Sequence, residues 1–319
     1  MKIVVTASAD LDLRPPVADK LRRIPIACLH HARLQLRPPA GHFYVSLQNV
    51  ASRLEEMLRR MEELKPPFGP GAAPEALGSL IEAMEVLLHA VMGHLEACQA
   101  ILFSLFASNR EALAAQSVKQ FIRETKAYRE QVAMIVNAVK HRGTRIGSAL
   151  MYDASAYAPG YFVESELEDG VIGPDRNIHH GGDTAISLFR DLKLHLCQLF
   201  FVGASVGKAV GAITPLEDGT DDEQVSKRGY RMRELVRKVS LLPEIVFPDE
   251  VYLPFPLIRL RSADDFGTEA EFSLNPRRVS TFGRFEMKVT YGGDSVAKTF
   301  KVPYLRPGWQ EDLAKRSRR

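Results

Sequence analysis

The sequence predicts a mainly α protein: an antiparallel bundle of about four long helices with an inserted β-hairpin, followed by a small β-rich C-terminal part. Apolar residues recur every three or four positions through most of the first two thirds, which is typical of amphipathic helices. Short β-prone pieces interrupt this pattern between Ile146 and Gly182, and strict alternation returns near the end. Composition is that of a globular protein, with 45% hydrophobic and 25% charged residues among 319, which excludes a disordered or fibrous chain.

The first expected elements are a short strand and two long helices. The start, MKIVV, indicates a strand, whereas residues 8–42 contain two Pro pairs and stay largely unassigned. From Phe43 to Leu64 the apolar positions mark an amphipathic helix, which the segment PPFGPGAAP ends. The next run, Glu75 to Phe106, is apolar almost all round, so we expect it to be the most buried helix.

Two further helices flank the expected hairpin. Ser108 is the expected N-cap of the third helix, and Gly143 is expected to follow its C-terminus. The pieces MYDASAY and YFVESELEDGV then predict the inserted hairpin. Asp183 is the expected N-cap of the fourth helix, which runs to about Ile213. Three glycines of this helix recur at every fourth position, a spacing that lets another helix approach closely: Gly203, Gly207 and Gly211.

Composition divides the chain into four parts. These are an N-terminal strand and irregular segment (1–42), the bundle (43–213), an acidic loop with a basic helix (214–242), and a β-rich part with a basic tail (243–319). In the last part, alternation from Phe285 to Tyr291 and the turn residues Gly292-Gly293-Asp294 predict a hairpin that returns through Val296 to Val302.

Cysteine usage and the N-terminus favour a cytoplasmic protein. Cys28, Cys98 and Cys197 lie far apart, so neither a disulfide framework nor a thiolate metal site is indicated. The start has no apolar core of a secretory signal. The segment from Leu194 to Ile213 is about long enough to span a bilayer, but it contains several polar residues. We therefore expect a buried helix and no membrane partner.

The common signatures of phosphate binding and hydrolysis are absent from the sequence. The segment GASVGKAVG contains Gly-Lys, but Val202 and Ala209 replace the Gly and the Ser or Thr that a phosphate-binding loop needs. No Gly-x-Ser-x-Gly or His-Glu-x-x-His motif occurs.

Two groups of histidines have simpler explanations than ligand binding. The segment DRNIHHGGD offers four potential metal ligands, but the last of them is more simply explained as a helix N-cap. The four are Asp175, His179, His180 and Asp183. On the second helix, Glu85 and His89 are one turn apart, with His94 farther along, and a core histidine is ordinarily hydrogen-bonded locally. We expect no metal and no cofactor.

The end of the third helix, QVAMIVNAVKHRGTRI, is the candidate site. Asn137 and His141 lie one turn apart on one face, and Lys140, Arg142 and Arg145 crowd the same terminus. A histidine that titrates near neutral pH can move the protons of RNA cleavage, while adjacent cations stabilise charge on a phosphate. Alternatively, these cations only complement the negative end of the helix dipole.

The bundle, from Phe43 to Ile213, resembles the HEPN superfamily of helical-bundle proteins. The resemblance depends on helix order and on Asn-x-x-Lys-His at Asn137 to His141. It implies a metal-independent endoribonuclease or RNA-binding protein of a bacterial toxin or antiphage type, with His141 as the catalytic residue and Asn137 as its polar partner. The family's Arg, four to six positions before the histidine, is absent, and Arg145 or Arg142 takes its role only by conjecture.

The alternative hypothesis is a non-catalytic interaction or scaffold protein. Family members often pair with two motifs facing one cleft, so the resemblance also implies a homodimer. The expected partners are therefore RNA, a second copy of the chain, and a protein partner at the C-terminal β part.

Overall fold

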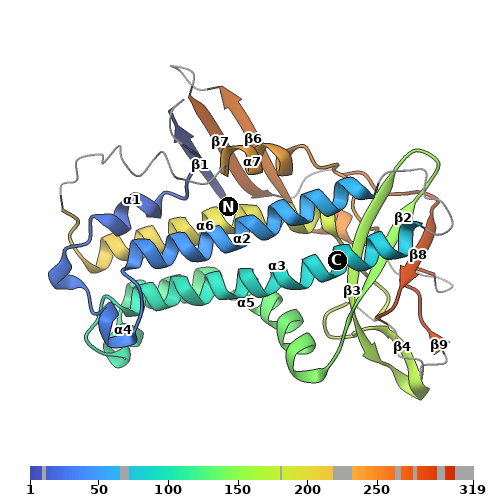
Figure 1. Ribbon diagram of the computed structural model, residues 1–319, viewed down its shortest axis with the longest axis horizontal. Coiled ribbons are helices and arrows are strands. Elements are labelled where there is room, and N and C mark those ends of the chain that lie inside the picture. The colour runs from blue at the N-terminus through green and yellow to red at the C-terminus, as the bar shows by residue number, and fades with distance from the viewer. Residues whose placement is uncertain are drawn as a thin grey trace.

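The computed structural model describes residues 1–8, 12–64, 72–179, 182–217, 232–262, 267–275, 279–292 and 299–305. Four long helices pack lengthwise in alternating directions: α2 (Pro39–Glu63), α3 (Ala72–Phe103), α5 (Gln116–Arg142) and α6 (Leu188–Ile213) (Figure 1). Short helices flank them: α1 (Val17–Arg22), α4 (Asn109–Ala114) and α7 (Met232–Ser240). The long helices expected from the apolar periodicity are therefore confirmed.

The fold is mixed α/β rather than mainly α, because strands from distant parts of the chain form two sheets. Helices account for 54% of the structure, and they pack against both sheets. The first sheet has the order β1-β7-β6 and is antiparallel, with β1 (Lys2–Ala7), β6 (Phe255–Ser262) and β7 (Thr268–Asn275). Phe272 of β7 stacks on Phe200 of α6 with ring centroids 3.9 Å apart, which joins this sheet to the bundle.

The second sheet is curled into a half-barrel with the order β8-β2-β3-β4-β9. Its strands are β2 (Ile146–Tyr152), β3 (Tyr157–Glu166), β4 (Val171–Pro174), β8 (Glu286–Thr290) and β9 (Thr299–Phe300), and β5 (Ile186–Ser187) pairs with β3. The Tyr291 ring lies near Phe162 of β3 and Phe300 of β9, with centroids 5.2 and 4.4 Å away. The curl therefore brings the two edges of the sheet together.

The prediction of an inserted hairpin is confirmed, but the prediction of a C-terminal hairpin is wrong. All of β2 pairs antiparallel with residues 157–163 of β3. β8, however, pairs with β2, and β9 pairs with β4, so the two strands expected to form the second hairpin lie at opposite edges of the sheet. β2 is buried, and β8 supplies hydrogen bonds to an edge that would otherwise have no partner. Most of the expected turn lies at 293–298, outside the described residues.

Helix boundaries differ from the expectation at two places. Ser108 caps α4 by accepting a hydrogen bond from the Glu111 N–H, as expected, but Ala115 is extended and separates α4 from α5. Asp183 does not cap α6, because the chain first pairs with β3 as β5 and the helix begins only after Ser187. The carboxylate of Asp183 instead lies 2.6 Å from the Lys301 ammonium.

The most buried long helix is α6, not α3 as expected. The buried share of the most apolar stretch is 67% in α6 and 56% in α3. By length and composition both helices could also cross a membrane. α1 packs against α6 at the glycines: a Cβ at Gly203 would lie 2.7 Å from Cβ of Pro15, whereas one at Gly211 would meet nothing within 4 Å. The close approach predicted from the glycine spacing is confirmed at Gly203 and also at Gly207.

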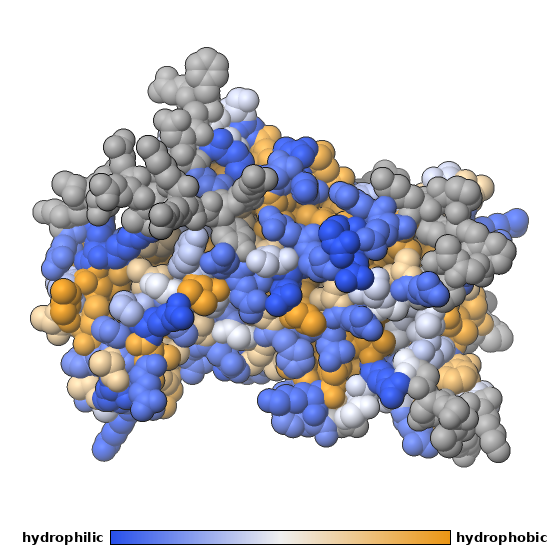
Figure 2. Space-filling model, in the orientation of Figure 1, coloured by the Kyte–Doolittle hydropathy of each residue, from blue (hydrophilic) through white to orange (hydrophobic). Residues whose placement is uncertain are grey.

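Strand pairing crosses the expected division of the chain. β1 belongs to the first part but pairs with β7, and β8 belongs to the last part but pairs with β2. The division itself stays a prediction. Of the basic helix expected at about 223–241, the structure describes α7, which packs on β6. Figure 2 shows that hydrophilic side chains cover much of the visible bundle face, with smaller apolar areas between them.

Candidate functional site at the end of α5

The candidate residues on α5 face solvent. Val132, Ile135 and Val136 are buried against the bundle, whereas Asn137, Lys140 and His141 are exposed. No side-chain hydrogen bond or ion pair joins those three to any other described residue. The side chain of Arg142 lies outside the described part of the chain.

Gly143 ends α5 as the sequence predicts. Its φ is +63°, a left-handed conformation that closes the helix and that a residue with a Cβ adopts only with strain. The exposed side chains therefore surround the C-terminal carbonyl end of a helix of 27 residues. The helix dipole stabilises cations there, so this end is a favourable place for Lys140.

Arg145 is anchored away from the helix end. Its guanidinium donates to the Gly292 carbonyl, and the Gly292 N–H donates to Glu164 Oε1 at 2.6 Å. The side chain lies so close over Gly292 that a Cβ there would be 2.6 Å from Arg145 Cδ. No hydrogen bond joins Arg145 to His141, so among the described side chains the predicted catalytic pair is not assembled.

An acidic cavity of about 480 Å³ lies beside this end of α5. Thr144 contributes to its wall, together with Glu166, Glu168 and Asp175. Arg176 pairs with Glu168 at 3.0 Å, while Asp175 accepts the Asn177 N–H at 2.8 Å and shapes a turn. Carboxylates repel phosphate, so this cavity does not suit an anionic ligand.

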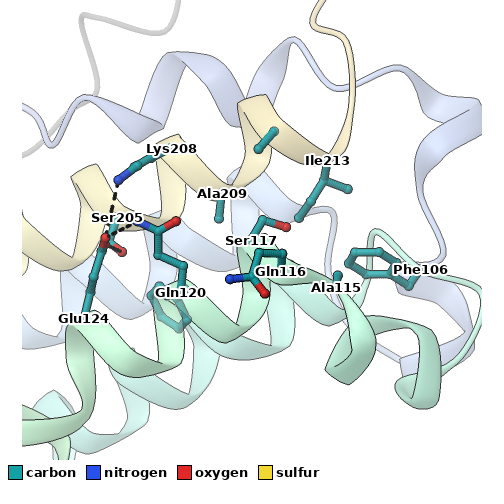
Figure 3. A pocket seen from close by; sticks show the side chains of 12 residues that line it. Phe106, Ala115, Gln116, Ser117, Gln120, Glu124, Ser205, Lys208, Ala209 and Ile213 are labelled. Carbon is teal, nitrogen blue, oxygen red and sulfur yellow. Dashed lines mark hydrogen bonds and ion pairs between the residues drawn. The ribbon is translucent and has the colours of Figure 1, made fainter.

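The second cavity, about 470 Å³, is a cleft between α5 and α6 (Figure 3). At its polar end Glu124 accepts hydrogen bonds from Ser205 at 2.5 Å, Gln120 at 2.8 Å and Lys208 at 3.4 Å. Burial acts to raise the pKa of Glu124, but these hydrogen bonds outweigh it and lower the pKa. The polar groups at this end bond to one another, and we assign no site here.

Among the described residues, neither group of histidines is assembled as a ligand site, and His180 lies outside them. His94 is buried between Ser46 Oγ, 2.9 Å from Nδ1, and Cys98 Sγ, 3.6 Å from Nε2, and burial lowers its pKa to about 4. His89 is exposed. The buried ring of His179 accepts the Val163 N–H at 2.8 Å. In the described part of the chain, no three His, Cys, Asp or Glu side chains are grouped as metal ligands.

Sequence reasoning missed a buried polar network at the centre of the molecule. The Tyr128 hydroxyl of α5 lies 2.7 Å from His195 Nδ1, and His195 Nε2 lies 3.2 Å from Asp191 Oδ2. The Tyr161 hydroxyl of β3 donates to the same carboxylate oxygen at 2.9 Å. Burial acts to raise the pKa of Asp191, but His195, Tyr161 and Arg190 outweigh it and lower the pKa.

This network is structural rather than catalytic. Tyr161, Asp191 and His195 are each 2% exposed or less, and neither cavity described above includes them. A fully buried polar group needs its hydrogen bonds, and here they tie α5, α6 and β3 together. The signal in the sequence was Asp191 and His195 four residues apart within an otherwise apolar helix.

A second buried carboxylate, Glu250, fixes the start of α6. It accepts the N–H groups of Ser187 at 3.2 Å and Phe247 at 3.0 Å, and Arg190 lies 3.7 Å away. Burial raises the pKa of Glu250 to about 8, with Arg190 acting in the opposite direction.

Comparisons with protein-family models, with curated proteins and with solved structures found no match.

Proposed function

We propose that this chain is a cytoplasmic RNA-binding protein that contacts the phosphate backbone through the exposed end of α5. The observation that carries the proposal is the exposure of Asn137, Lys140 and His141 on one helix end, without side-chain partners among the described residues. Lys140 supplies charge, and Asn137 and His141 supply hydrogen bonds. The HEPN-like resemblance, and with it the toxin or antiphage setting, is part of this proposal.

The geometry favours binding over cleavage. Metal-independent cleavage needs a base and a cation that meet at the same phosphate. Arg145 is bonded to Gly292 and not to His141. An endoribonuclease reaction with His141 as acid or base would need Lys140, or an Arg145 released from Gly292, as the cation at the phosphate.

The test measures binding of a single-stranded RNA by fluorescence anisotropy at several salt concentrations. Lys140→Ala is expected to weaken binding about threefold to tenfold, and to reduce the slope of log affinity against log salt by about 0.7, as for one lost phosphate contact. The matched control is Lys126→Ala, because Lys126 is exposed on the same helix and pairs with Glu130 at 3.7 Å. Equal loss in both variants, or in neither, would refute the assignment of the helix end.

The same samples are used to test whether the protein cleaves the RNA. In excess EDTA the RNA is expected to stay intact with the parent protein. Defined fragments from the parent, absent with His141→Ala, would instead establish a metal-independent nuclease.

A non-catalytic dimeric interaction protein is the second candidate function. It is favoured by the unpaired edge of β1, described below, and by the absence of an assembled catalytic pair among the described residues. A dimer that does not bind RNA would support this candidate over the first.

A further inference from the structure

Within the described ranges, no strand lies beside the outer edge of β1. The first sheet has the order β1-β7-β6, so β1 and β6 are its edges. Leu274 N–H donates to the Met1 carbonyl, which makes Met1 and Leu274 a hydrogen-bonded pair of the antiparallel ladder. Since such pairs alternate, Ile3, Val5 and Ala7 also bond to β7. The backbone groups of Lys2, Val4 and Thr6 therefore point outward.

The two edges of this sheet differ. On β6, the outward backbone positions include Pro256, which has no N–H, and Ile258, which is buried, and α7 packs against the strand. On β1, no outward backbone N–H or C=O bonds to another described backbone group, and Val4 is 45% exposed. An open edge of this kind is a template for another strand.

We propose that β1 pairs antiparallel with β1 of a second copy of this chain, with Val4 opposite Val4 on the two-fold axis. This register places Lys2 opposite Thr6 of the partner, so all three outward residues of each strand are used. Two hydrogen bonds for each of the three pairs give about six in total. The result is one continuous sheet with the order β6-β7-β1-β1-β7-β6.

The side chains on the outer face fit this register. Lys2 already pairs with Glu271 at 3.0 Å, and Glu271 also lies 3.8 Å from Arg261. Self-pairing sets no like charges opposite each other, because each Lys2 faces a threonine. The central contact is between two valines, a favourable cross-strand pair of β-branched residues. A foreign strand would have to reproduce this match, whereas a second copy does so by symmetry.

The first experiment measures oligomeric state by sedimentation equilibrium over a range of concentrations. A contact made by one strand pair lies at the small end of interface sizes, so a concentration-dependent monomer and dimer mixture is expected. Val4→Pro removes the outward N–H at the axis without removing a bond to β7, and is expected to give a monomer. Val4→Thr keeps the N–H and a β-branched side chain, and is expected to dimerise within about threefold of the parent. A parent that stays monomeric, or a Val4→Pro dimer, would overturn the proposal.

The second experiment tests the register without weakening the strand. In a Cys28→Ser background, Val4→Cys places the Cα atoms of two cysteines about 5.5 Å apart across the axis, a separation that a disulfide can bridge. Thr6→Cys is the matched control, because the two Thr6 positions lie about 14 Å apart along the strands. Mild oxidation is expected to give a disulfide dimer for Val4→Cys and not for Thr6→Cys. Equal cross-linking in both variants, or none with Val4→Cys, would refute this register.

Discussion

Replacing Glu250 by Gln is expected to remove a pH dependence of stability. Glu250 is 3% exposed, and burial raises its pKa from an ordinary 4.5 to about 8. The folded state therefore holds a proton that the unfolded state releases above about pH 4.5, so stability falls as pH rises and is lost through about pH 8. The difference between the two pKa values corresponds to about 5 kcal/mol over the whole range.

Glu250 and the histidines act in opposite directions between about pH 6.5 and 8. The pKa of His94 is lowered from 6.5 to about 4, so its contribution to stability rises with pH, with a last increment of about 0.4 kcal/mol above pH 6.5. The lowered pKa of His42 acts in the same direction. Between about pH 6.5 and 8, Glu250 alone lowers the free energy of unfolding by about 1.6 kcal/mol. A glutamine oxygen in the place of Oε2 accepts the N–H groups of both Ser187 and Phe247, which lie 3.3 and 3.0 Å from that atom.

The assay is urea unfolding of the parent, Glu250→Gln and the control Glu82→Gln, in which an exposed glutamate is changed. Across the window the parent and the control are each expected to lose about 1.6 kcal/mol relative to Glu250→Gln, because the histidines contribute equally in all three proteins. An equal change of stability with pH in the parent and in Glu250→Gln would refute the raised pKa of Glu250.

Two further predictions concern packing and the buried network. In urea unfolding, Gly203→Ala is expected to be less stable than Gly211→Ala by about 2 kcal/mol. Both variants gain helix propensity, but only the first adds a Cβ that would lie 2.7 Å from Pro15. Equal stabilities would contradict the close approach of the chain at Pro15 and α1. Tyr161→Phe is expected to cost about 1–3 kcal/mol, because Asp191 loses a hydrogen-bond donor, while the exposed control Tyr252→Phe is expected to cost under about 0.5 kcal/mol. Equal costs of the two tyrosine variants would show that the Tyr161 hydroxyl is not needed.

The long helices could be predicted from the sequence because their signal is local. The apolar positions from Phe43 to Leu64 predict α2 to within a few residues, since one face of the helix must be buried. Gly143 likewise predicts the end of α5, because only the local backbone conformation decides it. The exposed end of α5 followed from the same periodicity.

Strand partners could not be predicted, because they depend on residues far apart in the chain. The Gly292-Gly293-Asp294 turn signal favoured a local hairpin, but β2 offered β8 a longer ladder. Pairing of β1 with β7 joins residues near opposite ends of the chain, and no local pattern announces it. The Asp191 and His195 pair was visible as a spacing, but its tyrosine partners come from α5 and β3.

The two proposals together constrain how the end of α5 works. In the view of Figure 1, β1 lies above the bundle and the end of α5 lies below it. A dimer formed through β1 would therefore leave the two α5 ends apart, whereas the family resemblance implies two motifs that face one cleft. In such a dimer each His141 would act without a cation from the partner's α5 end. Self-pairing of β1 thus argues for two separate RNA-binding ends rather than one composite nuclease site, and a β1 dimer that cleaves RNA would show that a cation within the same chain completes the site.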